Sequence, residues 1–162
     1  MSASNTQVGG DHYAKLAIQP MKFAMANNWD ACAYGILKYV TRHQDKNGQT
    51  DIGKALHLVA LRQELLAGVH WRPEQVMPVI TMGEYLSQNR IAVHEAAALN
   101  ALQYWVYSGS QRKRHELLIA LGILHNRYNQ GGYDLQKQAS TQKPAGWCAD
   151  CFKDAQYPAA KL

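Results

Sequence analysis

A chain of 162 residues with 47% apolar and 18% charged residues is long enough for one globular domain, or for two small ones that share a core, and it is too apolar for a disordered protein. Its net charge of +5 is spread along the chain apart from one tight basic cluster at 112–114, so a general affinity for anions is favoured over a nucleic-acid surface. Because no apolar run is long enough to span a membrane and the N-terminal residues are polar, we expect a cytoplasmic protein.

Apolar periodicity and capping residues predict about six helices, and no segment has the alternation of a hairpin strand. Pro20 falls in the first turn of the first helix, where proline is tolerated, and Asp30 is a favourable N-cap for the second. Asp51 is expected to open the third helix and Gly68 to end it. The predicted helices cover about 17–28, 30–43, 51–67, 81–89, 93–107 and 113–128. The fold class is therefore predicted as all-α.

The two halves of the chain resemble each other. With the second half shifted back by 65 positions, identical residues align across two successive helices without a gap; examples are Ala31 and Ala96, Leu37 and Leu102, Tyr39 and Tyr104, Leu56 and Leu121, and Arg62 and Arg127. A true duplication would give two tandem three-helix units packed as a pseudo-dimer. We divide the chain into a first helical unit at 1–68, a degenerate second unit at 69–135 and a tail with a C-x-x-C motif at 136–162.

Cations gather in the first half. Lys38 and Arg42 are four residues apart and so project from one face of a helix. Arginine offers a planar fork that matches phosphate oxygens, and lysine offers a point charge. Together with His43, Lys46 and Lys54 they favour a phosphate-bearing ligand, and the alternative is that they are solvated charges on helix surfaces. The second half lacks cations at the aligned positions, so we place the site in the first half.

A second candidate is the string Gly9-Gly10-Asp11-His12-Tyr13. Adjacent glycines let backbone N–H groups approach an anion closely. His12 could act as an acid or a base, and Tyr13 could stack on a nucleotide base. The alternative is a terminal arm in which the histidine has no role.

Other chemistries lack their residue patterns. The chain has no P-loop motif, and it has no E-x-x-E pair of the kind that metal-dependent helical pyrophosphohydrolases need. Cys148 and Cys151 form a C-x-x-C motif in the tail, but a structural zinc site needs four ligands, so closing one would require histidines or another subunit. Cys32 is expected to be a buried small hydrophobe. No metal ligands are predicted.

Four short motifs together resemble the signature of a small phage domain family that includes the deoxynucleoside monophosphate kinase of short-tailed coliphages. They are Gly-Gly-Asp-His-Tyr at 9–13, Ile-Gln-Pro at 18–20, Gly-x-Leu-Lys-Tyr-x-x-Arg at 35–42 and Asp-Ile-x-Lys-Ala at 51–55. The resemblance covers about residues 8–66. It implies a phage-encoded protein of the host cytoplasm that acts on nucleotides, as a homo-oligomer.

From the residues and the resemblance together we assign His12, Lys38 and Arg42 as catalytic. The expected substrate-binding residues are Gly10, Asp11, Tyr13, Tyr39, His43, Lys46, Asp51 and Lys54. The cations would hold phosphates, His12 would shuttle a proton, and Tyr13 or Tyr39 would contact the base. On this basis Arg42→Ala should abolish activity and leave the fold intact.

The leading hypothesis is a deoxynucleotide-binding protein that works as a P-loop-independent (deoxy)nucleoside monophosphate kinase, with a nucleoside triphosphate as the phosphoryl donor and the need for Mg²⁺ left open. A second hypothesis is a non-enzymatic phage protein that binds a host protein or a nucleotide signal and so counters a bacterial defence. A third is an all-α nucleotide pyrophosphohydrolase. Neither a membrane nor a nucleic acid is an expected partner.

Overall fold

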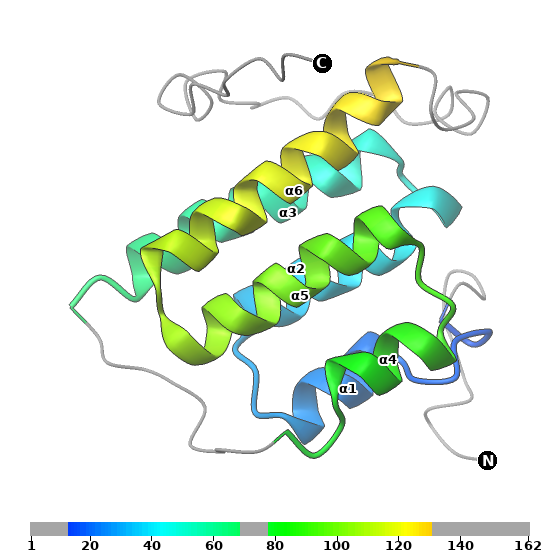
Figure 1. Cartoon of the computed structure of the whole chain (residues 1–162), viewed down its shortest axis with the longest axis horizontal. Helices are drawn as coiled ribbons and strands as arrows, with labels where there is room; N and C mark the ends of the chain where they lie inside the picture. The colour runs from blue at the N-terminus through cyan, green and yellow to red at the C-terminus, as the bar shows by residue number, and fades with distance from the viewer. Residues whose placement is uncertain (1–12, 69–77, 131–162) are drawn as a thin grey trace.

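A computed structural model of the chain describes residues 13–68 and 78–130. These residues form six α-helices and one short 3-10 helix, and they contain no strand (Figure 1). In chain order the elements are α1 (Pro20–Ala26), α2 (Ala31–Arg42), η2 (His43–Asp45), α3 (Gln49–Leu65), α4 (Met82–Gln88), α5 (Val93–Ser108) and α6 (Gln111–Asn129). The predicted all-α class with about six helices is confirmed. Within these ranges, no helix has both the length and the apolar character needed to cross a membrane.

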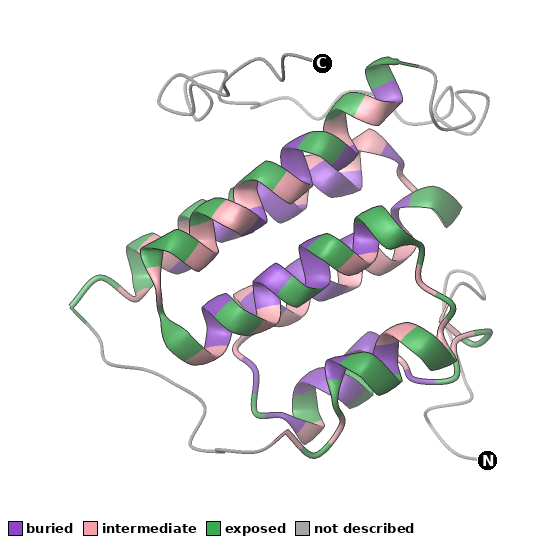
Figure 2. Ribbon diagram, viewed as in Figure 1, coloured by how far each residue is buried: buried purple, intermediate pink, exposed green. Residues whose placement is uncertain are grey.

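The four long helices pack as two layers. One layer holds α2 and α3, the other holds α5 and α6, and α5 packs on α2 while α6 packs on α3 (Figure 1). The short helices α1 and α4 lie side by side at the edge of this bundle, where the rings of Phe23 and Tyr85 meet with centroids 4.9 Å apart. Buried positions run along the sides of the helices that face one another (Figure 2). Apolar burial between the layers therefore holds the fold together.

Local signals explain where the helices begin. Pro20 lies in the first turn of α1, as predicted, but it is the first residue of that helix, which therefore starts three residues later than the expected start at about residue 17. Asp30 is the N-cap of α2, and its side chain accepts a hydrogen bond from the Ala33 backbone N–H at 2.8 Å. The predicted start of α3 at Asp51 is wrong, because α3 begins at Gln49, after Gly48 with φ +53°. The carboxylate of Asp51 binds side chains instead of capping the helix, as described below.

The helices repeat at an offset of 62 residues. The pairs of helix starts that share this offset are Pro20 and Met82, Ala31 and Val93, and Gln49 and Gln111. The offset of 65 expected from the sequence is therefore three residues too long. Three residues are close to one helical turn of 3.6 residues, so both offsets superimpose nearly the same helix face. Residue identities on that face therefore match at either offset, and the sequence alone led to the wrong one.

Two asparagines tie the repeated halves together in a reciprocal way. The Asn27 side chain donates to the Ile80 carbonyl at 2.8 Å and accepts from the Ile80 N–H at 3.2 Å. The Asn89 side chain donates to the Ile18 carbonyl at 2.8 Å and accepts from the Ile18 N–H at 3.0 Å. Both asparagines and both isoleucines are 62 positions apart. Such an exchange is what a two-fold axis imposes, so the chain packs as a pseudo-dimer of α1–α3 (the first unit) and α4–α6 (the second unit).

Candidate functional site

Three predicted site cations converge on one aromatic ring. The centroid of the Tyr39 ring lies 4.7 Å from Lys38 Nζ, 4.9 Å from the guanidinium carbon of Arg42 and 5.5 Å from Lys54 Nζ. Lys38, Tyr39 and Arg42 come from α2, and Lys54 comes from the first turns of α3. We call Lys38, Arg42 and Lys54 the cation cluster. The α2–α3 hairpin thus brings together residues that are up to 16 positions apart in the sequence.

Two of the three cations are held by one fully buried carboxylate. Asp51 accepts hydrogen bonds from Arg42 Nε at 2.9 Å and Arg42 Nη2 at 3.3 Å, and its Oδ1 also accepts from Lys54 Nζ at 3.3 Å. The side chain of Asn47, in the loop before α3, adds a further hydrogen bond at 3.1 Å. Both carboxylate oxygens are therefore used within the protein. Asp51 orders Arg42 and Lys54, and this differs from the expected role of contacting a substrate.

Fewer N–H groups of Arg42 are available to a ligand than the sequence suggested. The edge formed by Nε and Nη2 faces Asp51, and Nη1 donates to the Tyr13 hydroxyl at 3.0 Å. Burial acts to lower the pKa of Arg42, but the hydrogen bond to Asp51 and its charge outweigh burial and raise that pKa. Because a guanidinium has five N–H groups, one on Nη1 and one on Nη2 remain for a ligand.

This arrangement changes the expected effect of Arg42→Ala. Removing the guanidinium would leave the buried Asp51 without its main counter-charge, and breaking a buried ion pair from one side is strongly destabilising. The variant is therefore a poor probe of activity, because loss of the fold would also abolish it.

Lys38 differs from the other two cations. No carboxylate in the described part of the chain lies within 4 Å of its Nζ, which instead lies over the rings of Tyr34 and Tyr39. Partial burial and then the positive charge of Arg42 lower the pKa of Lys38, and Lys54 and Lys46 act in the same direction. The charge of Asp51 opposes this lowering without forming an ion pair with Lys38. A bound anion would therefore favour the charged form of this half-buried ammonium.

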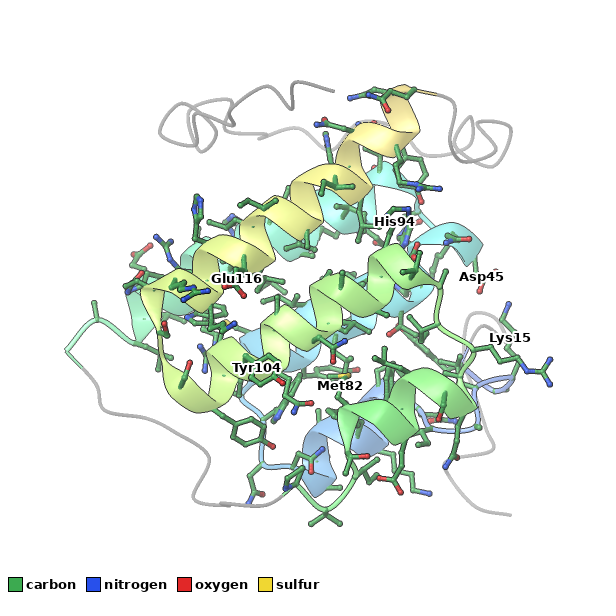
Figure 3. All side chains as sticks on the ribbon, viewed as in Figure 1. Lys15, Asp45, Met82, His94, Tyr104 and Glu116 are labelled. Atoms are coloured by element: carbon green, nitrogen blue, oxygen red, sulfur yellow. The ribbon has the colours of Figure 1, made fainter. Side chains whose placement is uncertain are left out.

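Side chains of the segment before α1 contact α2 and η2 near the cation cluster. Tyr13 accepts the hydrogen bond from Arg42, and burial is the main cause that raises the pKa of its hydroxyl. Lys15 forms an ion pair with Asp45 of η2 at 2.9 Å, at the end of the bundle where α3 begins (Figure 3). Tyr13 is thus at the cation cluster, as expected. Gly10, Asp11 and His12 lie outside the described residues.

His43 is not part of the cation cluster. It is buried, and its ring nitrogens contact the Tyr128 hydroxyl and, at 3.0 Å, Glu95 Oε1, which also accepts from Gln44 at 2.7 Å. His43 therefore links the two units through the core. Lys46 is exposed after η2. Its influence on the cluster is electrostatic, because its positive charge acts to lower the pKa of Lys38.

Sequence reasoning missed Tyr34 and Asn47. Tyr34 lies four residues before Lys38, so helical spacing could have placed its ring on the same face. Asn47 lies in the turn before α3, where an asparagine is common and carries no further signal. Cys32, expected to be buried, is half-buried.

The site suits an oxyanion. The cluster and Asp51 together carry three positive charges and one negative charge, a formal balance of +2. In the ranges 13–68 and 78–130 no three His, Cys, Asp or Glu side chains group closely enough to hold a metal ion, and the C-x-x-C motif lies outside these ranges. No protein-family model, curated protein sequence or solved structure matches the chain.

Proposed function

We propose that this protein binds deoxynucleotides through their phosphates at the cation cluster of the first unit, and that it is a phage protein of nucleotide metabolism. The observation that carries the proposal is the convergence of Lys38, Arg42 and Lys54, with Lys38 lacking a carboxylate partner. The resemblance of residues 8–66 to the small phage domain family that includes a deoxynucleoside monophosphate kinase points to the same ligand class from the sequence.

Charge supports a phosphate group as the moiety that is bound. A phosphomonoester at neutral pH carries between one and two negative charges, which is comparable with the balance of +2 in the site. Hydrogen bonds between a phosphate oxygen and a lysine or arginine are charge-assisted, and each contributes about 1.5–3 kcal/mol. Lys38 gains in addition because a bound anion offsets the cost of its partial burial.

We propose further that the protein transfers a phosphoryl group as a P-loop-independent deoxynucleoside monophosphate kinase, with a nucleoside triphosphate as the donor. Phosphoryl transfer depends mainly on positioning and on neutralising charge at the equatorial oxygens. In this scheme Lys38 and Lys54 hold the phosphates, and the two remaining N–H groups of Arg42 contact the group that is transferred.

A nucleotide panel tests both parts of the proposal. Melting temperature is measured with each deoxynucleoside monophosphate and, as a control, with each deoxynucleoside at the same concentration, because a ligand that binds only the folded state raises stability. We expect a rise for at least one monophosphate and none for its nucleoside. At a ligand concentration of about 100 times Kd the rise corresponds to about 2.7 kcal/mol.

The same samples, supplied with a nucleoside triphosphate and Mg²⁺, are assayed for the deoxynucleoside diphosphate. Product supports the kinase. A melting shift without product would contradict the kinase and keep the binding proposal, and the absence of a shift with every nucleotide would contradict both.

A further inference from the structure

We propose that Tyr39 is a positioning residue whose aromatic ring keeps the three cations of the cluster together in the absence of ligand. The inference rests on the proposed function, because it explains how the phosphate site is formed before a phosphate arrives. The ring belongs to α2 and packs against the hydrophobic core, so its orientation is fixed by the fold. Tyr39 is thereby assigned a different role from the base contact expected from the sequence.

The need for such a residue follows from repulsion. Asp51 forms ion pairs with Arg42 and Lys54 but not with Lys38. Burial and the charge of Arg42 act to lower the pKa of Lys38, the charge of Asp51 opposes them, and the charge of Lys54 adds to the lowering. Because Lys38 has no ion-pair partner of its own, the repulsion from Arg42 and Lys54 favours conformations in which the flexible Lys38 side chain turns towards water. The face of an aromatic ring attracts cations within about 6 Å of its centroid, and all three cations lie within that range.

The second unit provides an internal comparison. At the offset of 62, Tyr39 corresponds to Ala101, and the cluster positions Lys38, Arg42 and Lys54 correspond to Asn100, Tyr104 and Glu116. The unit that lacks the three cations also lacks the ring. The ring and the three cations therefore occur together in the first unit, and both are missing from the equivalent positions of the second.

Replacing the ring tests the inference. Tyr39→Phe keeps the aromatic face, while Tyr39→Leu and Tyr39→Met keep apolar volume without it. Tyr104→Leu, which removes an exposed ring from the second unit, is the matched control. Three quantities are measured for each variant: the pKa of the Lys38 ammonium by NMR, the Kd of the deoxynucleoside monophosphate that binds best, and the midpoint of unfolding.

We expect Tyr39→Phe and Tyr104→Leu to stay within about twofold of the natural protein in Kd, with an unchanged Lys38 pKa. Tyr39→Leu and Tyr39→Met should weaken binding about tenfold and lower the Lys38 pKa further, because the ammonium loses its contact with the ring. A merely structural role would not move the Lys38 pKa while the unfolding midpoint is retained.

The inference is overturned if a folded Leu or Met variant keeps the Lys38 pKa, or if Tyr39→Phe behaves like Tyr39→Leu, which would assign the effect to the hydroxyl. Should Leu destroy the fold, Met and Phe still decide the outcome. If the natural protein binds no nucleotide, the proposed function fails, whereas the Lys38 titration continues to test the role of Tyr39.

Discussion

The two units place polar clusters at the same point of the same fold, but the central residues of the clusters have opposite charges. In the first unit the central residue is Asp51, which binds Arg42 and Lys54. In the second unit the position of Asp51 is taken by Lys113, which pairs with Glu116 at 2.8 Å and lies 5.1 Å from the centroid of the Tyr104 ring. Tyr104 and Glu116 occupy the positions of Arg42 and Lys54, on the α5–α6 hairpin (Figure 3).

The clusters differ in burial as well as in sign. The Asp51 side chain is 0% exposed, whereas Lys113 and Glu116 are 32% and 37% exposed. An ion pair in water contributes little to stability, while a buried carboxylate depends on its partners. The backbone therefore does not determine the site. The first unit has a buried acid that gathers cations, and the second has an ordinary surface pair.

The largest effect is expected when the central residue of each cluster is removed. Asp51→Ala leaves Arg42, whose side chain is 12% exposed, without its counter-charge and should lower the free energy of unfolding by about 3 kcal/mol. Lys113→Ala removes the residue at the equivalent position and should change it by less than about 1 kcal/mol. Urea unfolding measures both, and equal losses would contradict the contrast between the clusters.

A smaller effect is expected from the reciprocal asparagines. Asn27 is fully buried and makes three hydrogen bonds to the backbone at Val79 and Ile80, whereas Asn89 is half-buried and makes two to Ile18. Asn27→Ala should cost about 2 kcal/mol and Asn89→Ala about 1 kcal/mol, because unpaired backbone groups are more costly when buried. Thermal unfolding compares them, and a larger loss for Asn89→Ala would be inconsistent with this ranking.

A small effect at neutral pH is expected at a position where the two units differ by one hydroxyl. Tyr85 corresponds to Phe23, and its hydroxyl lies 2.7 Å from Thr41 Oγ1. Tyr85→Phe makes the two positions alike and should cost about 1 kcal/mol near pH 7.

The same substitution should change the response to alkali. Burial raises the pKa of Tyr85 well above its ordinary value of about 10, so above that pH the folded state holds a proton that the unfolded state has lost. Stability therefore falls as the pH rises from about 10. In Tyr85→Phe the fall should be shallower, and it should persist in part because the pKa values of Tyr13 and Tyr34 are also raised. The loss of stability is measured as the difference between the unfolding free energies at about pH 8 and about pH 11. The same loss in Tyr85→Phe as in the natural protein would contradict its assignment to the Tyr85 hydroxyl.

Much of the fold could be predicted because it depends on local signals. Pro20 and Asp30 mark helix starts through their own chemistry, and the convergence of Lys38 with Arg42 follows from helical spacing. The start of α3 was misplaced because an acidic residue near a helix start looks the same whether it caps the helix or binds an arginine nine residues away. That choice is made by tertiary packing.

His43 shows why the site was predicted only in part. Neighbouring residues on a helix point about 100° apart, so a residue next to Arg42 need not face the same surface. At this position the chain passes from α2 into η2, and His43 turns towards Glu95 and Tyr128 of the second unit. Both partners are distant from His43 in the sequence, so helical spacing could not identify them.

The central claim is that a nucleotide phosphate binds at the cation cluster through Lys38. It is tested most directly by calorimetric titration of a deoxynucleoside monophosphate into the natural protein, into Lys38→Met and into Lys22→Met, which removes an exposed lysine of α1. Loss of one charge-assisted hydrogen bond should weaken binding to Lys38→Met by about tenfold or more, with Lys22→Met unchanged. Equal affinity of the natural protein and Lys38→Met would contradict the claim.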